Sequence, residues 1–201
     1  MTRIHILASA ALVMLAAAPN MVLSQSQQRG APEQFTANAQ ATAASGASAA
    51  ATVTIDIRRY TPDAERTAVE AALKGGGYPA FLSALRKASE VGTVGMGTQK
   101  WAIRWAREQS SPSGRTIVVV TDQPMFFIGG ARTNAKPRAG YEVGLIRLQV
   151  DAAGMGKGEM AAAARVKPGG ETGVQVDDYA EQPITLTGVS RKIVAETPGK
   201  N

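Results

Sequence analysis

The chain has 201 residues, no cysteine, one histidine and a formal net charge of +6. The absence of cysteine excludes disulfide bonds, thiol chemistry and a lipoprotein anchor. The basic residues are dispersed among sixteen acidic ones without a run of five or more. This dispersal favours a solvated surface over a nucleic-acid partner, and we expect no nucleic acid to be bound.

The amino terminus predicts export. Arg3 precedes an uncharged apolar run at residues 6–18, and this layout is typical of a secretory signal peptide. We expect residues 1–24 to be the signal, with cleavage after either Ala18 or Ser24, and an uncleaved anchor is the alternative. No later stretch is apolar enough for a membrane span. The mature protein is therefore expected to be secreted or periplasmic.

Residues 25–51 are predicted to form a disordered linker. They are rich in Gln, Ala, Ser, Gly and Thr and hold almost no large apolar side chain. Such a segment cannot bury enough surface to offset the entropy lost on ordering. A single domain is expected over residues 52–190, followed by a flexible tail over residues 191–201.

The domain is predicted to open with one strand and two helices. Apolar and polar residues alternate over residues 52–57, which indicates a half-buried strand. Pro62 suits the first position of a helix, which the glycines at 75–77 end. A second short helix should start at Pro79. We expect the two helices to pack against each other as a hairpin.

Strands separated by turn residues are predicted for the rest of the domain. Trp101 and Trp105 lie in an alternating pattern, and the turn at 111–114 should join them to a strand at 116–121 as a hairpin. Residues 129–140 are predicted to be a long loop. Residues 160–164 include an alanine run, which has poor strand propensity, but we assign it to a strand from its context. Further strands are expected at 91–96, 141–150, 159–166, 173–178 and 184–189.

This order of elements predicts the α+β class. We expect a curved antiparallel sheet of six to eight strands, with the helical hairpin inserted after the first strand and packed on one face. The order is similar to the helix-grip arrangement, in which a sheet wraps a long carboxy-terminal helix and leaves a ligand cavity. Too few residues follow the last predicted strand for that helix. Any cavity would therefore be lined by the helical hairpin.

Three segments carry a resemblance to a family of exported bacterial proteins of unknown function. They are residues 60–66, residues 116–122 with Pro124, and residues 178–179 with 182–184. The resemblance implies a single domain after a signal peptide. It implies no catalytic residue.

The residues available for catalysis are limited. The only histidine, His5, lies in the predicted signal, so the mature chain lacks the side chains for Ser-His-Asp and Cys-His mechanisms and the usual ligands of zinc. We expect no metal and no cofactor. Asp177 and Asp178 are adjacent, but neighbours on a strand point to opposite faces. The glycine-rich residues 151–158 lack the Ser or Thr that a phosphate loop needs after its lysine, and they are predicted to form a turn.

The candidate contact residues are aromatic side chains near the sheet and one neighbouring arginine. The aromatic residues can line a pocket for an apolar or sugar ligand, or they can pack in the core. Core packing is favoured for the two tryptophans, because their spacing places them on one strand face. The apolar run 124–128 is a contact surface if it is exposed. The candidates are Trp101, Trp105, Arg104, Phe126, Phe127 and Tyr141.

These observations favour an exported, non-enzymatic domain. It would bind a small, partly apolar ligand beneath the helical hairpin, or an envelope partner through the loop at 126–141. One alternative is a carboxylate-dependent hydrolase in which Asp56 or Asp122 is the acid. Another is a structural component of the cell envelope.

Overall fold

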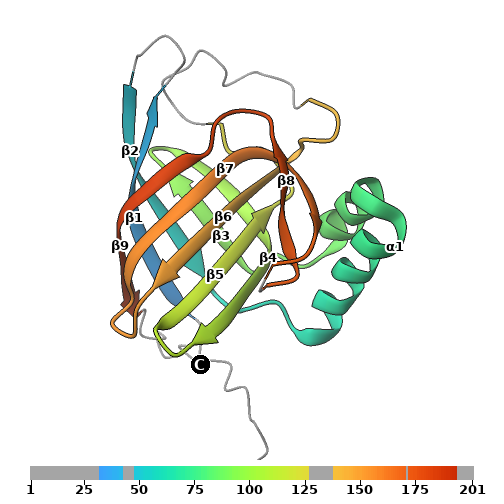
Figure 1. The fold of residues 1–201 in the computed structure, drawn as a ribbon, viewed down its shortest axis with the longest axis horizontal. Coiled ribbons are helices and arrows are strands. Elements are labelled where there is room, and N and C mark those ends of the chain that lie inside the picture. The colour runs from blue at the N-terminus through green and yellow to red at the C-terminus, as the bar shows by residue number, and fades with distance from the viewer. Residues whose placement is uncertain (1–31, 43–47, 127–137, 171, 194–201) are drawn as a thin grey trace, which may run out of the picture.

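The computed structural model describes residues 32–42, 48–126, 138–170 and 172–193. These ranges hold nine strands and one helix (Figure 1). In chain order the elements are β1 (Glu33–Thr42), β2 (Ser48–Ile57), α1 (Asp63–Lys87), β3 (Gly92–Met96), β4 (Gln99–Ser111), β5 (Gly114–Thr121), β6 (Val143–Val150), β7 (Met155–Pro168), β8 (Val174–Tyr179) and β9 (Ile184–Ile193).

Eight of the strands form a closed antiparallel barrel. The strand order is β6-β5-β4-β3-β2-β1-β9-β7, and a further pairing between β6 and β7 closes the ring. The ninth strand, β8, continues the sheet from β7, outside the ring. Because β2 to β7 are neighbours in chain order, most of the ring is a simple meander. β1 and β2 also pair as chain neighbours, and the long-range step is the insertion of β9 between β7 and β1.

The predicted α+β class with an open curved sheet is therefore wrong. Its main error lies in residues 25–51, which were predicted to be a linker, whereas residues 33–42 form β1 and residues 48–51 begin β2. Phe35, Ala37 and Ala39 of β1 are at most 3% exposed. Two of these three buried side chains are alanines, and their small apolar surface gave too weak a pattern to indicate a strand.

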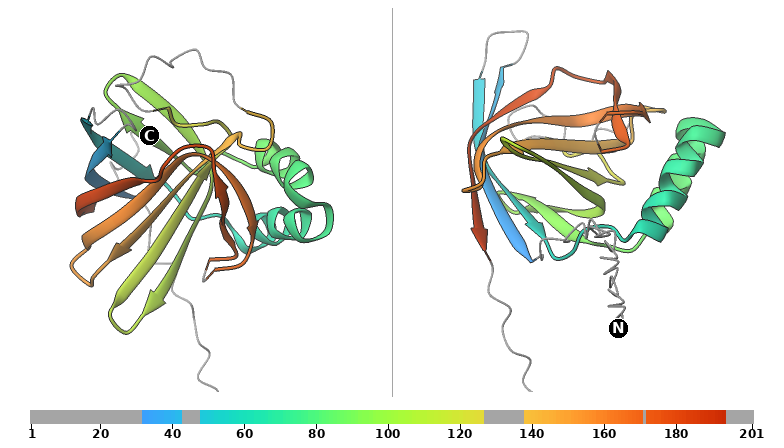
Figure 2. Two further views of the ribbon diagram at one scale, coloured as in Figure 1. Left: turned by 45° about the horizontal axis from the view of Figure 1, so that its top comes forward. Right: turned by 60° about the horizontal axis from the view of Figure 1, so that its bottom comes forward.

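The predicted helical hairpin is also wrong, because α1 is a single helix with a kink. Gly77 interrupts it with φ 64° and ψ −161°, and Pro79 follows two residues later. Both halves pack against the outside of the barrel, through Val69 and Leu73 before the kink and Phe81 after it. The helix stands beside the barrel (Figure 2), so no sheet wraps it and the helix-grip analogy does not hold.

The kink gives a matched pair of glycine substitutions. Only glycine readily adopts the backbone conformation of Gly77, so Gly77→Ala should lower the free energy of unfolding by about 1–3 kcal/mol. Gly75 is helical and an added Cβ meets nothing within 4 Å, so Gly75→Ala should raise that free energy by about 0.5–1 kcal/mol. Urea unfolding of both variants measures the difference, and equal effects would contradict the kink.

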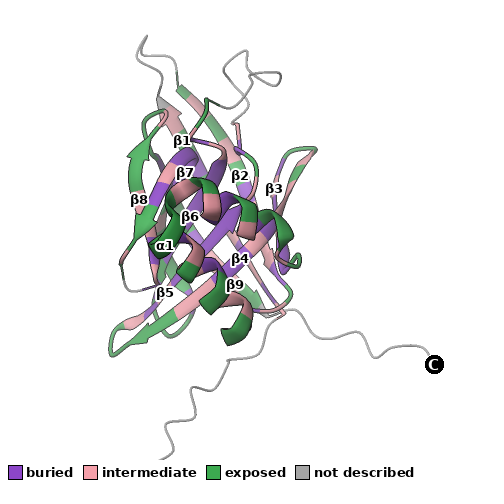
Figure 3. Cartoon of the chain, turned by 90° about the vertical axis from the view of Figure 1, so that its right-hand side faces the viewer, coloured by how far each residue is buried: buried purple, intermediate pink, exposed green. Residues whose placement is uncertain are grey.

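The protein has two apolar cores, one inside the barrel and one beneath α1. The inner core collects side chains from all eight strands of the ring. The outer core holds the buried face of α1 and the outward side chains of β4 to β8. Figure 3 shows the helix in front of the buried segments of these strands. Strands such as β5 are therefore buried on both faces, with Ile117 and Val119 pointing inward and Val118 and Val120 pointing towards the helix.

Several local predictions are confirmed. β4 and β5 form the predicted hairpin, and the alanine run at 160–164 lies in β7. Ala161 and Ala164 belong to the outer core. Their small side chains leave room for the helix to pack against β7. The tail predicted from residue 191 is wrong for residues 191–193, which belong to β9. Residues 194–201 lie outside the described ranges.

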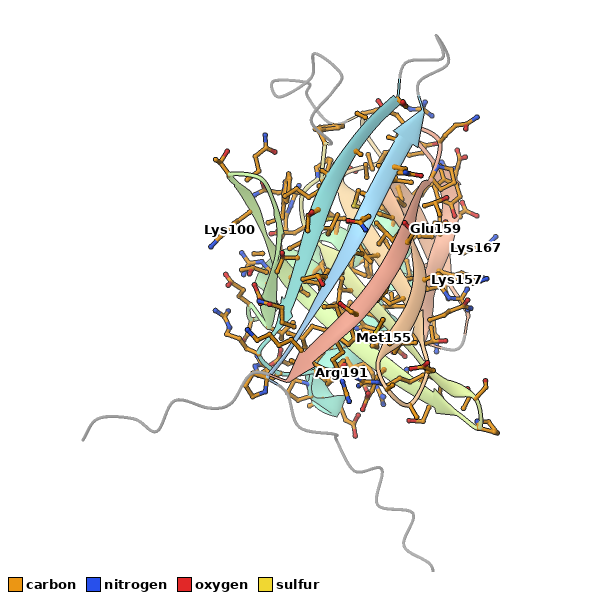
Figure 4. All side chains as sticks on the ribbon, turned by 90° about the vertical axis from the view of Figure 1, so that its left-hand side faces the viewer. Lys100, Met155, Lys157, Glu159, Lys167 and Arg191 are labelled. Carbon is orange, nitrogen blue, oxygen red and sulfur yellow. The ribbon has the colours of Figure 1, made fainter. Side chains whose placement is uncertain are left out.

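The helix does not cover the outer face of β1, β2 and β9 (Figure 4), and part of this face carries neutral polar side chains. The pairing aligns Thr54, Thr36 and Ser190 in one row and Thr52, Asn38 and Thr187 in the next. Within the described ranges, no helix combines the length and the apolarity that crossing a membrane requires.

Candidate functional site

The interior of the barrel is filled by its own side chains. The members of the inner core are at most 7% exposed. An eight-stranded barrel is just wide enough to be filled in this way or to hold one small ligand. After β5, Met125 enters this core with no exposed surface, and its amide donates to the carbonyl of Ala162 at 2.7 Å. A barrel filled in this way leaves room for a ligand on its outside.

A buried ionic network lies at the end of the barrel where β1 and β5 begin. Arg115 donates to both carboxylate oxygens of Glu33, at 3.0 and 2.6 Å, and to Glu108 at 2.7 Å. Tyr60 donates to the same Glu33 carboxylate. Burial, together with the nearby Glu33 charge, raises the pKa of Tyr60 well above its ordinary value. The network joins β1, β4 and β5, and its charged groups form hydrogen bonds and ion pairs with one another.

The two candidate tryptophans lie on opposite faces of β4. The pairing with β5 shifts between Ile103 and Trp105, which marks a β-bulge at Arg104. Trp101 therefore packs, half-buried, against the inner core, whereas Trp105 is fully buried in the outer core beneath α1. The prediction that the two side chains share a face is wrong, because the bulge inserts one residue and reverses the alternation.

The other candidates near this hairpin do not form a pocket among the described residues. Arg104 donates to Asp122 at 3.3 Å and to the carbonyl of Ala88 at 3.4 Å, so it links β4 to the end of α1. Pro124 and Met125 are buried and Phe126 is half-buried, so this part of the apolar run is not an exposed contact surface. Phe127 lies outside the described ranges.

Tyr141 is held in a separate cluster. It is 3% exposed, and its hydroxyl donates to Asp178. The guanidinium groups of Arg138 and Arg165 lie over its ring, at 4.1 and 5.4 Å from the centroid. The hydrogen bond to Asp178, and then burial, raise the pKa of Tyr141. Arg165 also pairs with Asp177 at 3.1 Å. The side chain of Tyr141 is therefore a structural anchor for the segment that follows Arg138.

The carboxylates named for a hydrolase are already engaged. Asp56 and Glu33 both line a hollow of about 290 Å³ at the end of the barrel where β1 begins. Asp56 accepts a hydrogen bond from Gln34, and Arg115 occupies both oxygens of Glu33. Asp122 is paired with Arg104. No pair of these carboxyl groups is left facing a common substrate position.

The larger hollow lies between the second half of α1 and the segment before β6. Its volume is about 490 Å³, and we call it the α1 groove. One wall is formed by two rows of helical residues spaced four apart, which therefore lie along one side of the helix. The other wall is formed by Ala139, Gly140 and Glu142. The groove is lined by Tyr78, Pro79, Leu82, Ser83, Arg86, Lys87, Ala139, Gly140 and Glu142.

The α1 groove combines an apolar floor with charged ends. Leu82 is 8% exposed and its neighbours Phe81 and Leu85 are fully buried in the outer core, which fixes this half of the helix. Tyr78 accepts a hydrogen bond from the amide of Glu142 at 2.7 Å. Burial, and then the hydrogen bond with the Glu142 side chain, raise the pKa of Tyr78.

None of the six candidate contact residues predicted from the sequence lines the α1 groove. The available signal was the i, i+4 spacing of Arg86 and Lys87 from Leu82 and Ser83. That signal is common to many surface helices. What makes a groove here is the approach of residues 139–142, which are more than fifty positions away in the sequence.

Within the described residues, the protein is an eight-stranded antiparallel barrel with a filled interior. One helix packs on its outside, and the α1 groove lies beside this helix. Comparisons with protein families, with curated proteins and with solved structures found no match.

Proposed function

We propose that this chain is an exported, non-enzymatic binding domain and that a small, partly apolar ligand occupies the α1 groove. The observation that carries the proposal is an external hollow of about 490 Å³ beside a barrel whose interior is filled. Export is part of the proposal and is supported by the apolar run at residues 6–18.

The size and lining of the groove support this function. Sites for small molecules commonly measure 300–1,000 Å³ and combine an apolar lining with a few polar groups. The helical wall of the α1 groove combines the apolar side chains of Pro79 and Leu82 with the hydroxyl of Ser83. The helix that forms this wall is anchored by fully buried side chains, so the wall is preorganised and binding orders little of the protein.

Thermal unfolding of the full chain tests the proposal. It is measured with a panel of lipids, sugars, nucleotides and metal ions, because a ligand at 100 times its dissociation constant adds about 2.7 kcal/mol to the native state. We expect stabilisation by a partly apolar class. Ser83→Phe places a ring in the groove and should abolish the effect. Ala68→Phe, at an exposed helical position outside the groove, should leave it unchanged.

Two results would contradict the proposal. If Ser83→Phe keeps the stabilisation, the ligand binds elsewhere, for example to the apolar amino terminus. If no class stabilises the protein, a structural role in the cell envelope becomes the better hypothesis. Capture of a partner from the envelope would then be the next experiment.

A further inference from the structure

The α1 groove has a direction. Its helical wall consists of the rows Tyr78, Leu82, Arg86 and Pro79, Ser83, Lys87. A helix rises 1.5 Å per residue, so each row spans about 12 Å. Apolar and neutral side chains begin both rows, and a cation ends each. The helical wall is therefore uncharged at one end and positive at the other.

The two cations at the positive end have no counterion within the described part of the chain. Arg86 and Lys87 are exposed, and neither takes part in an ion pair there. Most other arginines differ, since Arg58, Arg104 and Arg115 each bind a carboxylate. Cations in the last turn of a helix also favour its dipole, but that interaction leaves their outward hydrogen-bond donors free for a ligand.

The opposite end carries a fixed carboxylate. Glu142 lies on the second wall, next to Tyr78, and accepts a hydrogen bond from the amide of Gly140 at 2.9 Å. These contacts hold Glu142 beside Tyr78, and Tyr78 precedes Arg86 by about 12 Å along the helix. A ligand with an anionic group at both ends would bring its second charge against this carboxylate.

We propose that the α1 groove selects a linear amphipathic monoanion, with its carboxylate or phosphate at Arg86 and Lys87 and its alkyl chain along Leu82. In the same proposal, Glu142 is a specificity determinant that excludes a second anionic group. Carboxylate and phosphate share the chemistry needed, because both accept charge-assisted hydrogen bonds from a guanidinium and an ammonium group. This inference rests on the proposed function.

Four eight-carbon ligands test the selectivity by titration calorimetry on the full chain. We expect n-octanoate and n-octyl phosphate to bind, and 1-octanol and octanedioate to bind about tenfold more weakly, a ratio that corresponds to about 1.4 kcal/mol. The variant Arg86→Gln/Lys87→Gln should lose the preference for the anions over 1-octanol. Lys74→Gln is the matched control, because Lys74 is exposed on the same helix and does not line the groove.

A second variant tests the role of Glu142. Glu142→Gln keeps an oxygen that accepts from Gly140 but removes the charge, so octanedioate should bind about as tightly as octanoate. A Glu142→Gln variant that still discriminates against octanedioate would overturn the specificity role. Unfolding of each variant in urea checks that the fold is retained.

The remaining outcomes separate this inference from the proposed function. If 1-octanol binds as tightly as octanoate and Ser83→Phe abolishes both, the groove binds ligands but the anion selectivity is wrong. If binding persists in Ser83→Phe, the proposed function itself is wrong. Binding to vesicles that contain anionic lipid, without binding to the free eight-carbon anions, would replace the small ligand with a membrane surface and would overturn the inference.

Discussion

Replacing Arg115 with methionine is expected to lower the free energy of unfolding by about 3–5 kcal/mol. Arg115 is 6% exposed and Glu33 is 5% exposed. Among the described residues, the substitution leaves the buried Glu33 carboxylate with Tyr60 and a more distant Arg191, whose Nη1 lies 3.8 Å from Glu33 Oε2. A buried charge without its partner keeps the cost of desolvation and loses the compensating attraction.

The expected loss comes from the unpaired charge, so a second substitution should recover part of it. In Arg115→Met/Glu33→Gln, the group left beside Tyr60 is neutral and can still accept its hydrogen bond. Arg165→Met is the control, because Arg165 has a side chain that is 43% exposed in its ion pair with Asp177, and such pairs contribute about 0–1 kcal/mol. Urea unfolding measures all three variants. If Arg115→Met and Arg165→Met lower the free energy of unfolding by similar amounts, the buried network does not contribute more to stability than an exposed ion pair.

Truncating Trp105 to alanine is expected to cost about 3–5 kcal/mol. Trp105 has no exposed surface and lies in the outer core between β4 and the helix. Its removal would leave a cavity beneath α1 that the neighbouring strands cannot fill. Its indole nitrogen, Nε1, is buried without a hydrogen-bond partner within the described residues, so Trp105→Phe removes an unsatisfied donor along with some volume. That variant should therefore cost much less than alanine.

The position of the bulge predicts different losses of stability when the two tryptophans are truncated. Trp101→Ala should cost less than Trp105→Ala, because Trp101 is only half-buried against the inner core. Limited proteolysis near the glycines at 75–77 adds a readout of helix docking, and we expect faster cleavage in Trp105→Ala than in Trp101→Ala. Equal stability losses, with equal cleavage rates, would contradict the placement of Trp105 beneath the helix.

The sequence predicted the local elements well where a strong short-range signal existed. The start of α1 follows from Pro62 and the acidic first turn, and the β4–β5 hairpin follows from alternating apolar residues around a glycine-containing turn. It failed at β1, where Phe35 is the only large apolar side chain among the inward-facing residues. It also failed at the bulge in β4, because nothing in the residues at 101–105 indicates where the alternation reverses.

For the candidate site too, the sequence indicated some residues correctly as buried but could not indicate the groove. The aromatic residues that the sequence singled out are structural, since Trp105 and Tyr141 are buried and Tyr141 is hydrogen-bonded. The α1 groove could not be predicted, because it exists only where the helix meets residues 139–142. A groove between two distant segments is a property of their packing and not of either segment.

By itself, the sequence determined the chemistry available to this protein and the positions of most strands. It has no cysteine and one histidine near its amino terminus, and periodicity and turn residues act over a few positions, so both can be read locally. Tertiary structure decided that the sheet closes into a barrel, which face Trp105 occupies and where a groove forms. These features depend on contacts between distant segments, such as β1 with β9, and small side chains such as Ala37 and Ala39 contribute to such contacts through their fit rather than through a strong hydrophobic pattern.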